Sequence, residues 1–389
     1  MFPFVALAPA LYSLQEDKQQ AGQLLERAGR LLQGGQLVES KSARRTRLQL
    51  SGELRSLRLS GFSVETARSA NPLWASGFLQ AQYQNSDAEN GANDAFRIRR
   101  ARLNGNYLPD ARVMGRASVE FASGTNQTTT QIRDAFIQYR PNTFLNFDGP
   151  VFTLGQMNTP LGYEISLPSF VRTWPERSQY EQAFFSGERS RGFLAQFGSV
   201  DNYVYLGAFN ALTVNDPEQA NLAAGTEDKI GGLGGVRLQR GAWNGGVSAM
   251  FTRRPKYVTG GVTAPEGTRE FQYVDLRFAP LDSPWEIKGE AMLGRDRIPA
   301  GTASATNRSR PVFGAHFQVD HQINSKDILM LRAETFDRNR DRDGNKIDLI
   351  GAGWVHDATQ NLRLTGAVEF IHDSGRRVGQ RGYTALTLR

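Results

Sequence analysis

The sequence predicts an all-β fold, a 16-stranded antiparallel transmembrane β-barrel with a short N-terminal helical segment. Two patterns in the chain point to this fold. First, apolar and polar residues alternate along many short segments, for example over 113–121, 285–293 and 362–370, as they do in strands with one apolar face. Second, the connectors between these segments are alternately short and long, as in barrels that cross a membrane. No run of residues approaches the ~18 apolar residues of a membrane-spanning helix.

The predicted barrel occupies residues 77–389, which number 313, or about 20 for each strand with its connector. The polar strand faces should line the lumen, and sixteen strands should leave a water-filled channel rather than a packed core. One connector, 141–150, should be a short turn and is too long for one. The expected strands are 77–84, 96–107, 113–121, 132–140, 151–156, 192–198, 203–210, 231–239, 245–256, 269–279, 286–296, 311–323, 328–337, 346–356, 362–373 and 381–389.

The N-terminal part differs in character from the barrel. Residues 1–14 are a possible signal-like apolar segment, although no positive residues precede the apolar run. Residues 15–35 predict an amphipathic helix or a short coiled coil, because apolar residues recur there at spacings of three and four. Residues 36–76 are expected to be a linker with short strands.

The composition narrows the possible functions. The 389 residues include 46 Lys and Arg against 39 Asp and Glu, with four His and no Cys. The absence of Cys excludes disulfide frameworks, Cys-ligated metal sites and cysteine nucleophiles. No His lies in an HExxH pattern. We therefore expect no catalytic residues, no metal and no cofactor.

Arginine supplies most of the positive charges of the predicted inner wall. Two interpretations stay open for these side chains: a track for anions along the lumen, or structural ion pairs with the equally numerous carboxylates of the same wall. Arg97 and Arg99 alternate in phase with the apolar face of their strand. They are expected on the lipid side near the loop rim, where a charge costs little. The candidate track consists of Arg100, Arg102, Arg116, Arg277, Arg332 and Arg363.

Four short stretches carry a resemblance to a known family. They are Arg99-Arg100-Ala101-Arg102-Leu103, Asp134-Ala135-Phe136-Ile137-Gln138-Tyr139, Gly155-Gln156-Met157-Asn158-Thr159-Pro160-Leu161-Gly162 and Arg191-Gly192-Phe193. In these stretches the chain resembles the phosphate-selective porin O and P family of Gram-negative outer membranes. The resemblance implies a homotrimer of sixteen-stranded barrels, passive diffusion, and a third long loop that folds inward as a constriction.

That constriction loop should be residues 157–191, the longest predicted loop. The family's phosphate preference looks to depend on lysines at the constriction, and this loop contains none. The identity of the transported solute is therefore left open. The candidate constriction residues are Arg172, Arg177, Arg189, Tyr163 and Trp174.

The expected function is an outer-membrane porin for small anions, phosphate-like ones included, or small polar solutes, with outer-membrane lipid around it and no nucleic-acid partner. One alternative is a general or oligosaccharide- or organic-acid-selective porin, with the loop aromatics stacking on the solute. Another is a barrel anchor whose N-terminal segment binds the cell wall or a partner. An enzyme is disfavoured, because none of the four His lies in the long loops.

Overall fold

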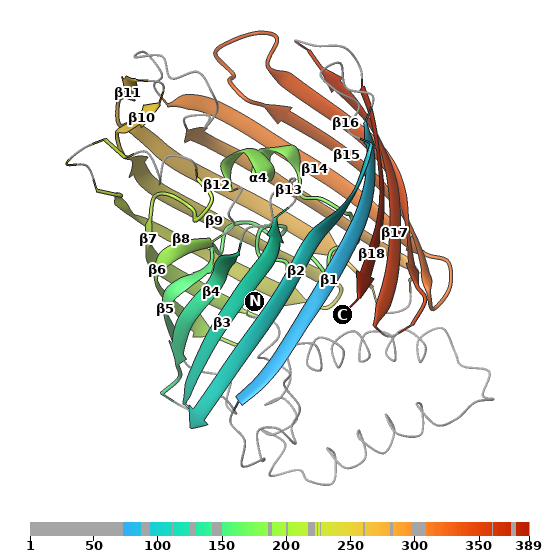
Figure 1. The fold of residues 1–389 in the computed structure, drawn as a ribbon, viewed down its shortest axis with the longest axis horizontal. Helices are drawn as coiled ribbons and strands as arrows, with labels where there is room; N and C mark the ends of the chain where they lie inside the picture. The colour runs from blue at the N-terminus through green and yellow to red at the C-terminus, as the bar shows by residue number, and fades with distance from the viewer. Residues whose placement is uncertain are drawn as a thin grey trace.

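The computed structural model of the chain describes residues 73–86, 94–110, 112–123, 130–141, 150–185, 189–199, 201–216, 222–223, 225, 227–259, 261–280, 283–296, 309–359, 361–374 and 379–388. Its main body is one closed antiparallel barrel of sixteen strands (Figure 1). The strands are β1 (Leu73–Ser86), β2 (Ala95–Asp110), β3 (Val113–Ser123), β4 (Gln131–Tyr139), β5 (Val151–Asn158), β6 (Arg189–Gly198), β7 (Tyr203–Asn210), β8 (Ile230–Arg240), β9 (Trp243–Arg254), β12 (Gly267–Phe278), β13 (Trp285–Asp296), β14 (Arg310–Gln322), β15 (Asp327–Asp337), β16 (Lys346–Asp357), β17 (Leu362–Asp373) and β18 (Gly379–Leu388).

The predicted sixteen-stranded antiparallel barrel is confirmed. Each strand pairs with its neighbours in sequence, and β1 pairs with β18 to close the ring, from Leu79 opposite Leu388 to Ser86 opposite Arg381. The first strand begins at Leu73, four residues before the predicted start. Two small elements were not predicted: the hairpin of β10 (Tyr257–Thr259) and β11 (Val262–Ala264), and helix α4 (Gln179–Phe184).

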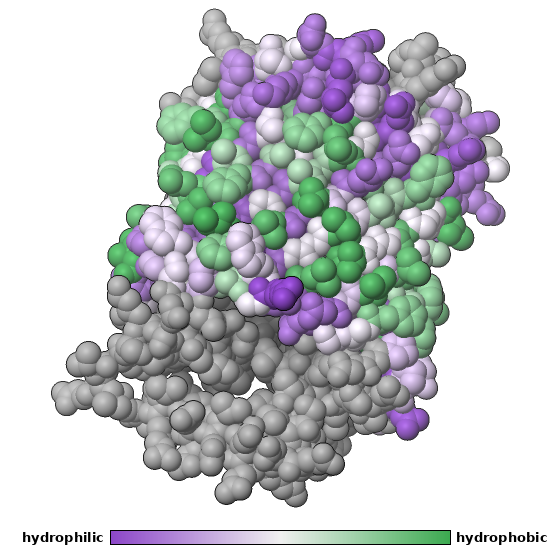
Figure 2. Space-filling model, turned by 180° about the vertical axis from the view of Figure 1, so that it is seen from behind, coloured by the Kyte–Doolittle hydropathy of each residue, from purple (hydrophilic) through white to green (hydrophobic). Residues whose placement is uncertain are grey.

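Side chains alternate between the two faces of the wall. On β15, Leu329 and Leu331 are exposed on the outside, whereas Met330 and Arg332 are buried on the inside. Hydrophobic residues form a broad band over the outer surface, with hydrophilic residues gathered beyond it at one end (Figure 2). At the end with the short turns, outward aromatic rings pack in pairs: Trp243 on Phe278, with ring centroids 4.4 Å apart, and Trp285 on His321 at 4.0 Å. Such girdles mark the edges of a membrane barrel.

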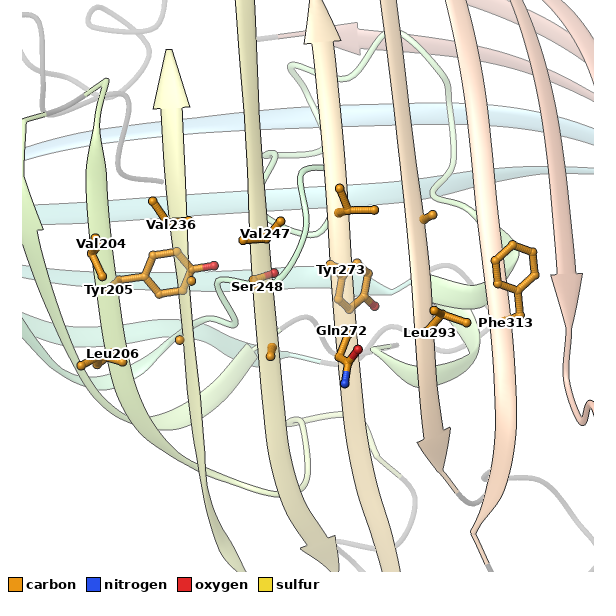
Figure 3. A pocket seen from close by; sticks show the side chains of 15 residues that line it. Val204, Tyr205, Leu206, Val236, Val247, Ser248, Gln272, Tyr273, Leu293 and Phe313 are labelled. Carbon is orange, nitrogen blue, oxygen red and sulfur yellow. The ribbon is translucent and has the colours of Figure 1, made fainter. Parts of the chain in front are cut away.

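An apolar groove crosses the outer surface from β7 to β14 (Figure 3). Exposed Val204, Leu206, Val247 and Val274 border it, and the small residue Gly234 lies among them, where the absence of a side chain leaves a depression. The groove opens away from the lumen, so it is not part of a path through the barrel.

Three neighbouring strands carry β-bulges at similar height. Along the β1–β2 pair, Gln80 faces Arg100 but Ala81 faces Ile98, so Arg99 is an extra residue. The β2–β3 and β3–β4 registers shift in the same way, at Ala101/Arg102 and Ser118/Val119. A bulge redirects the side chains that precede it, and here it changes which residues face the lumen.

The interior is not an open, water-lined tube over its whole width. Apolar side chains of the segment between β5 and β6 pack on inward-facing apolar residues of the wall, which corrects the expectation of a lumen without a packed core. The cluster includes Leu161, Ile165, Tyr180, Phe184 and Phe185 from the loop, and Tyr205, Phe209, Leu233, Met250, Phe271, Met292 and Phe336 from the strands.

The predicted N-terminal segments, 1–14, 15–35 and 36–76 up to residue 72, lie outside the described residues, as does most of the anomalous connector, residues 142–149. Among the described residues, no helix is long and apolar enough to cross a lipid bilayer.

The outer face should tolerate charge only near its edges. Leu331→Lys places an ammonium group in the middle of the outer face of β15, and it should lower the free energy of unfolding from a bilayer by ~2–4 kcal/mol. Ile230→Lys, at the loop end of β8, is the control and should cost ~0–1 kcal/mol. Denaturant titration in lipid vesicles measures both. Equal losses would contradict the placement of Leu331 at mid-membrane depth.

Candidate functional site

The segment between β5 and β6 folds into the barrel. It runs from residue 159 to residue 188 and is shorter than the predicted loop 157–191, because β5 and β6 include the two ends of that loop. Residues 159–185 of it are described. Helix α4 in this segment is drawn inside the ring of strands (Figure 1), and Tyr180 and Phe184 on it are fully buried. We call residues 159–188 the constriction loop. Its position inside the barrel agrees with the predicted inward fold.

One side of the constriction loop is fastened to β13–β17. Glu164 forms a two-pronged ion pair with Arg332, with nitrogen–oxygen distances of 2.8 and 3.1 Å. The Tyr180 hydroxyl lies 3.0 Å from Glu290 Oε1 and 2.8 Å from His316 Nδ1. The backbone amide of Gln179 donates a hydrogen bond to Glu334. These contacts bind the loop to the wall through charged and polar groups.

Trp174 and Thr173 extend the same attachment. The Trp174 indole nitrogen donates to Glu369 at 2.9 Å, and the ring is almost fully buried. The Thr173 hydroxyl donates to Asp320 at 2.9 Å and accepts from Lys288. The aromatic side chain of Trp174 therefore pins the loop to the wall instead of presenting a free face to a solute.

The other side of the constriction loop reaches β2. Glu176 accepts hydrogen bonds from Arg99 at 2.8 and 2.9 Å and from Arg100 at 3.2 Å. Burial opposes ionisation of Glu176, but the two guanidinium groups outweigh it and hold the pKa of the carboxyl far below its usual range. Because the loop is ion-paired to β2 and to β15, it crosses the lumen and narrows it.

The bulge on β2 corrects one expectation about this wall. Arg97 and Arg99 were expected on the lipid face. Arg97 instead lies opposite buried Gln82, and Arg99 bonds to Glu176 of the constriction loop, so both side chains lie on the lumen side of the wall. Arg133 is also buried, next to Asp134 at the bulge on β4. Sequence reasoning missed these three residues. The available signal was a pair of adjacent polar residues, Arg99-Arg100 and Arg133-Asp134, which breaks the alternation within a strand.

The six residues of the candidate anion track all face the interior, and each has a carboxylate partner. The nitrogen–oxygen distances are 3.2 Å for Arg100 and Glu176, 2.5 Å for Arg102 and Glu120, 3.4 Å for Arg116 and Asp134, 2.8 Å for Arg277 and Glu286, 2.8 Å for Arg332 and Glu164, and 2.8 Å for Arg363 and Asp357. The wall therefore carries paired charges at these positions rather than a bare row of cations.

The predicted constriction residues have different environments. Arg189 is the first residue of β6 and pairs with Asp134 at 2.9 Å. Arg177 donates to the backbone carbonyls of Glu164, Ile165 and Leu167, so it holds the loop's own shape. Tyr163 lies under Arg237, whose guanidinium carbon is 6.0 Å from the ring centroid.

Arg172 is the exception among these arginines. Its side chain is buried, yet none of its three guanidinium nitrogens has a hydrogen-bond partner among the described residues. Burial lowers its pKa, while Glu164, Glu176 and Glu181 at longer range favour the charged form. A buried cation without hydrogen bonds is costly, which marks Arg172 as a place where an external acceptor would be stabilised.

A second charge cluster holds the end of α4. Arg254, Arg269, Asp216 and Asp296 are all buried, with Arg254 Nε 2.6 Å from Asp296 and Arg269 Nη1 3.0 Å from Asp216. Arg269 also donates to the carbonyl oxygens of Phe184 and Ala211 at 2.5 and 2.6 Å. One guanidinium thus connects β12, the end of α4 and the loop after β7.

Comparison with known proteins places these features in context. Residues 75–295, which are 221 of the 389, match the family described as phosphate-selective porin O and P. No curated protein sequence matches the chain. The fold is similar to an anion-selective porin from Comamonas acidovorans, with a TM-score of 0.57 and 12% identity over 81% of this chain and 98% of that one.

Two further solved structures have a similar fold. The outer-membrane channel DcaP of Acinetobacter baumannii gives a TM-score of 0.56 at 12% identity, over 81% of this chain and 96% of that chain. OmpT of Vibrio cholerae gives 0.55 at 10% identity, over 82% and 98%. At such low identity these likenesses establish the shared fold alone.

The buried charge cluster predicts a large mutational effect. Arg269→Met removes the bonds to Phe184 and Ala211 and leaves Asp216 less compensated, so the free energy of unfolding should fall by ~3–5 kcal/mol. Arg295→Met is the matched control, because Arg295 and its partner Glu270 are both exposed, and its loss should be ~0–1 kcal/mol. Denaturant titration measures both variants. A loss at Arg269 as small as that at Arg295 would contradict the structural role.

Proposed function

The chain belongs to the phosphate-selective porin O and P family and is an outer-membrane porin, and from this premise we propose that its pore passes small anions, phosphate-like oxyanions among them, in preference to cations. Its family and fold are those of a channel. Solutes cross by diffusion, and the constriction loop sets both the size limit and the electrostatic filter. No step of covalent chemistry is needed.

Arg172 is the observation that carries the anion preference. It lies in the constriction loop, and its guanidinium is the one in the candidate set that has no hydrogen-bond partner among the described residues. An oxyanion that reaches this group gains charge-assisted hydrogen bonds, and the planar guanidinium fits two oxygens of a phosphate or carboxylate at once. Arg172 would therefore attract anions where the lumen is narrowest, in place of the lysines that the family resemblance implies.

The neighbouring wall supports the same preference. Arg97, Arg99 and Arg100 converge near Glu176 from β2, and Arg381 lies close by on β18. Two carboxylates, Glu176 and Glu369, face these four guanidinium groups, so the local potential is positive. A positive potential between low-dielectric walls concentrates anions and excludes cations.

A general pore for small polar solutes is the second candidate. The paired arginines of the candidate track favour it, because each is balanced by a carboxylate. The oligosaccharide alternative is less well supported, since Trp174 and Tyr180 are buried against the wall. We also propose the homotrimer that family membership implies. The alternative of an N-terminal anchor concerns residues that lie outside the described part of the chain.

Conductance in planar bilayers tests the anion preference. Under a KCl gradient, the reversal potential should have the sign of chloride permeation, and added phosphate should block the current in a concentration-dependent manner. A cation-sided potential without phosphate block would favour the general pore. A complete lack of conductance by the full chain would contradict the channel function.

Arg172→Gln should weaken the anion site without removing the pore. Because one charge-assisted interaction contributes ~1.5–3 kcal/mol, the phosphate concentration for half block should rise ~10- to 100-fold, and the reversal potential should move toward zero. Arg253→Gln is the control, because Arg253 is exposed on the outer side of β9 and gives the same change in charge. Equal effects of the two substitutions would show that only net charge matters.

A further inference from the structure

Two glycines on the inner face of the barrel wall lie directly beneath aromatic side chains of the constriction loop. Gly314 on β14 and Gly351 on β16 are both buried and alternate in phase with the inward-facing residues of their strands. A Cβ atom placed on Gly314 would overlap Tyr180, and one placed on Gly351 would lie 2.8 Å from the Trp174 ring. Each aromatic ring therefore occupies the space in which a wall side chain would otherwise stand.

Large buried side chains surround Gly314 and leave a notch above it. Met292 on β13 and Phe336 on β15 are its partners across the two neighbouring strands, and His316 is the next inward-facing residue along β14. Helix α4 packs against β14, and its Tyr180 ring fills the notch. The ring stacks beside His316, with ring centroids 6.1 Å apart, and packs on Phe336 at 6.5 Å.

The notch above Gly351 is bounded by charged groups. The partners of Gly351 across the neighbouring strands are Arg332 on β15 and Glu369 on β17. The Trp174 indole nitrogen donates to Glu369 at 2.9 Å, and the Arg332 guanidinium carbon lies 5.9 Å from the centroid of the indole ring. The ring is thus held from both flanks, while the glycine lets it lie against the backbone of the wall.

The next inward glycine of β16 shows that a missing side chain does not by itself admit the loop. A Cβ on Gly353 would lie 2.7 Å from Met330 Cε and 2.9 Å from the Gly366 carbonyl oxygen, which are both wall atoms. A Cβ on Gly351 would lie at the same 2.9 Å from the Val368 carbonyl oxygen. The two positions therefore differ chiefly in the loop residue that covers one of them.

We propose that Gly314 and Gly351 are positioning residues of the pore: they form two notches that seat Tyr180 and Trp174 and so set how far the constriction loop projects into the lumen. Glycine within a strand costs conformational entropy, and it often marks the close approach of another segment. A side chain at either position lifts the loop from the wall and narrows the opening. This inference rests on the proposed function, in which the same loop limits the pore.

The Gly314 notch is the stricter of the two. A Cβ there would lie 2.7 Å from the Tyr180 Cβ, whereas carbon atoms in contact need ~3.5–4.0 Å. The Tyr180 Cβ is bonded to the helix backbone, so rotation of the ring does not relieve the overlap and α4 has to move by about 1 Å. At Gly351 the overlap is with the far end of the indole, and the ring escapes only by giving up its bond to Glu369.

Single-channel conductance and the entry of polyethylene glycols of graded size test the notches. Gly314→Ala and Gly351→Ala should each lower the conductance by roughly 1.5- to 3-fold and exclude smaller polymers, because flux and the size limit depend on the pore diameter. Gly353→Ala is the matched control on the same face of β16, and it should conduct like the wild type. Equal effects at Gly351 and Gly353 would overturn the notch at Gly351.

A volume swap separates positioning from a general loss of stability. Gly314→Leu alone should narrow the pore, and Tyr180→Ala alone should leave the notch empty and widen it. The double variant returns apolar volume to the notch from the wall side, so its conductance should come back toward the wild-type value instead of combining two defects. A double variant as narrow as Gly314→Leu would overturn the notch. Gly314→Ala with Tyr180→Ala gives the same test if the leucine variant does not fold.

Cysteine cross-linking locates the loop without reference to conduction. The chain has no Cys, and the two Cβ positions are close enough for a disulfide after a shift of about 1 Å. Gly314→Cys with Tyr180→Cys should therefore cross-link on mild oxidation of the folded barrel, whereas Gly353→Cys with Tyr180→Cys should not. A failure to cross-link would overturn the notch. A cross-link together with wild-type conductance in Gly314→Ala and Gly314→Leu would instead contradict the proposed function, in which the loop limits the pore.

Discussion

Closure of the sheet, β1 against β18, is the constraint on which the rest of this structure depends. In a bilayer every backbone amide and carbonyl must find a partner within the protein, and a ring of antiparallel strands meets that requirement without leaving an edge. Once the ring is closed, the period of two along each strand divides the side chains into an outer and an inner set. The exposed leucines and valines outside, and the arginines and carboxylates inside, are consequences of that division.

The ring is wide enough that its own side chains do not fill it, so a loop takes the space. The constriction loop enters with apolar residues, which pack on an apolar region of the inner wall, and with charged residues, which pair with both sides. Glu164 with Arg332 and Glu176 with Arg99 act as two ends of one bridge across the lumen. The loop is thus held by burial and by electrostatics together, and its place determines where the pore is narrowest.

Inside the barrel, positive and negative side chains are arranged mostly as ion pairs. Most inward arginines lie against a carboxylate, which reduces both the cost of burial and the field that a solute meets. Two departures from this balance lie in the loop. Arg172 is a cation without a hydrogen-bond partner among the described residues, and Glu181 is a carboxyl group without a donor. Both lie in the constriction loop, so the charges that lack a hydrogen-bonding partner there belong to one segment of the chain.

The sequence by itself determined the strands, their alternation, the connector lengths and the position of the longest loop, because each of these is a local pattern of neighbouring residues. Even the residues of the inner wall, such as Arg102 and Arg332, were predicted from strand phase. The tertiary structure decided what depends on register and on distant contacts. A bulge of one residue at Arg99 moved Arg97 and Arg99 from the expected outer face to the lumen. Trp174 meets Glu369, and Glu164 meets Arg332, across 195 and 168 positions of the chain. No local pattern encodes such pairs, because they arise only when the ring closes and the loop folds into it.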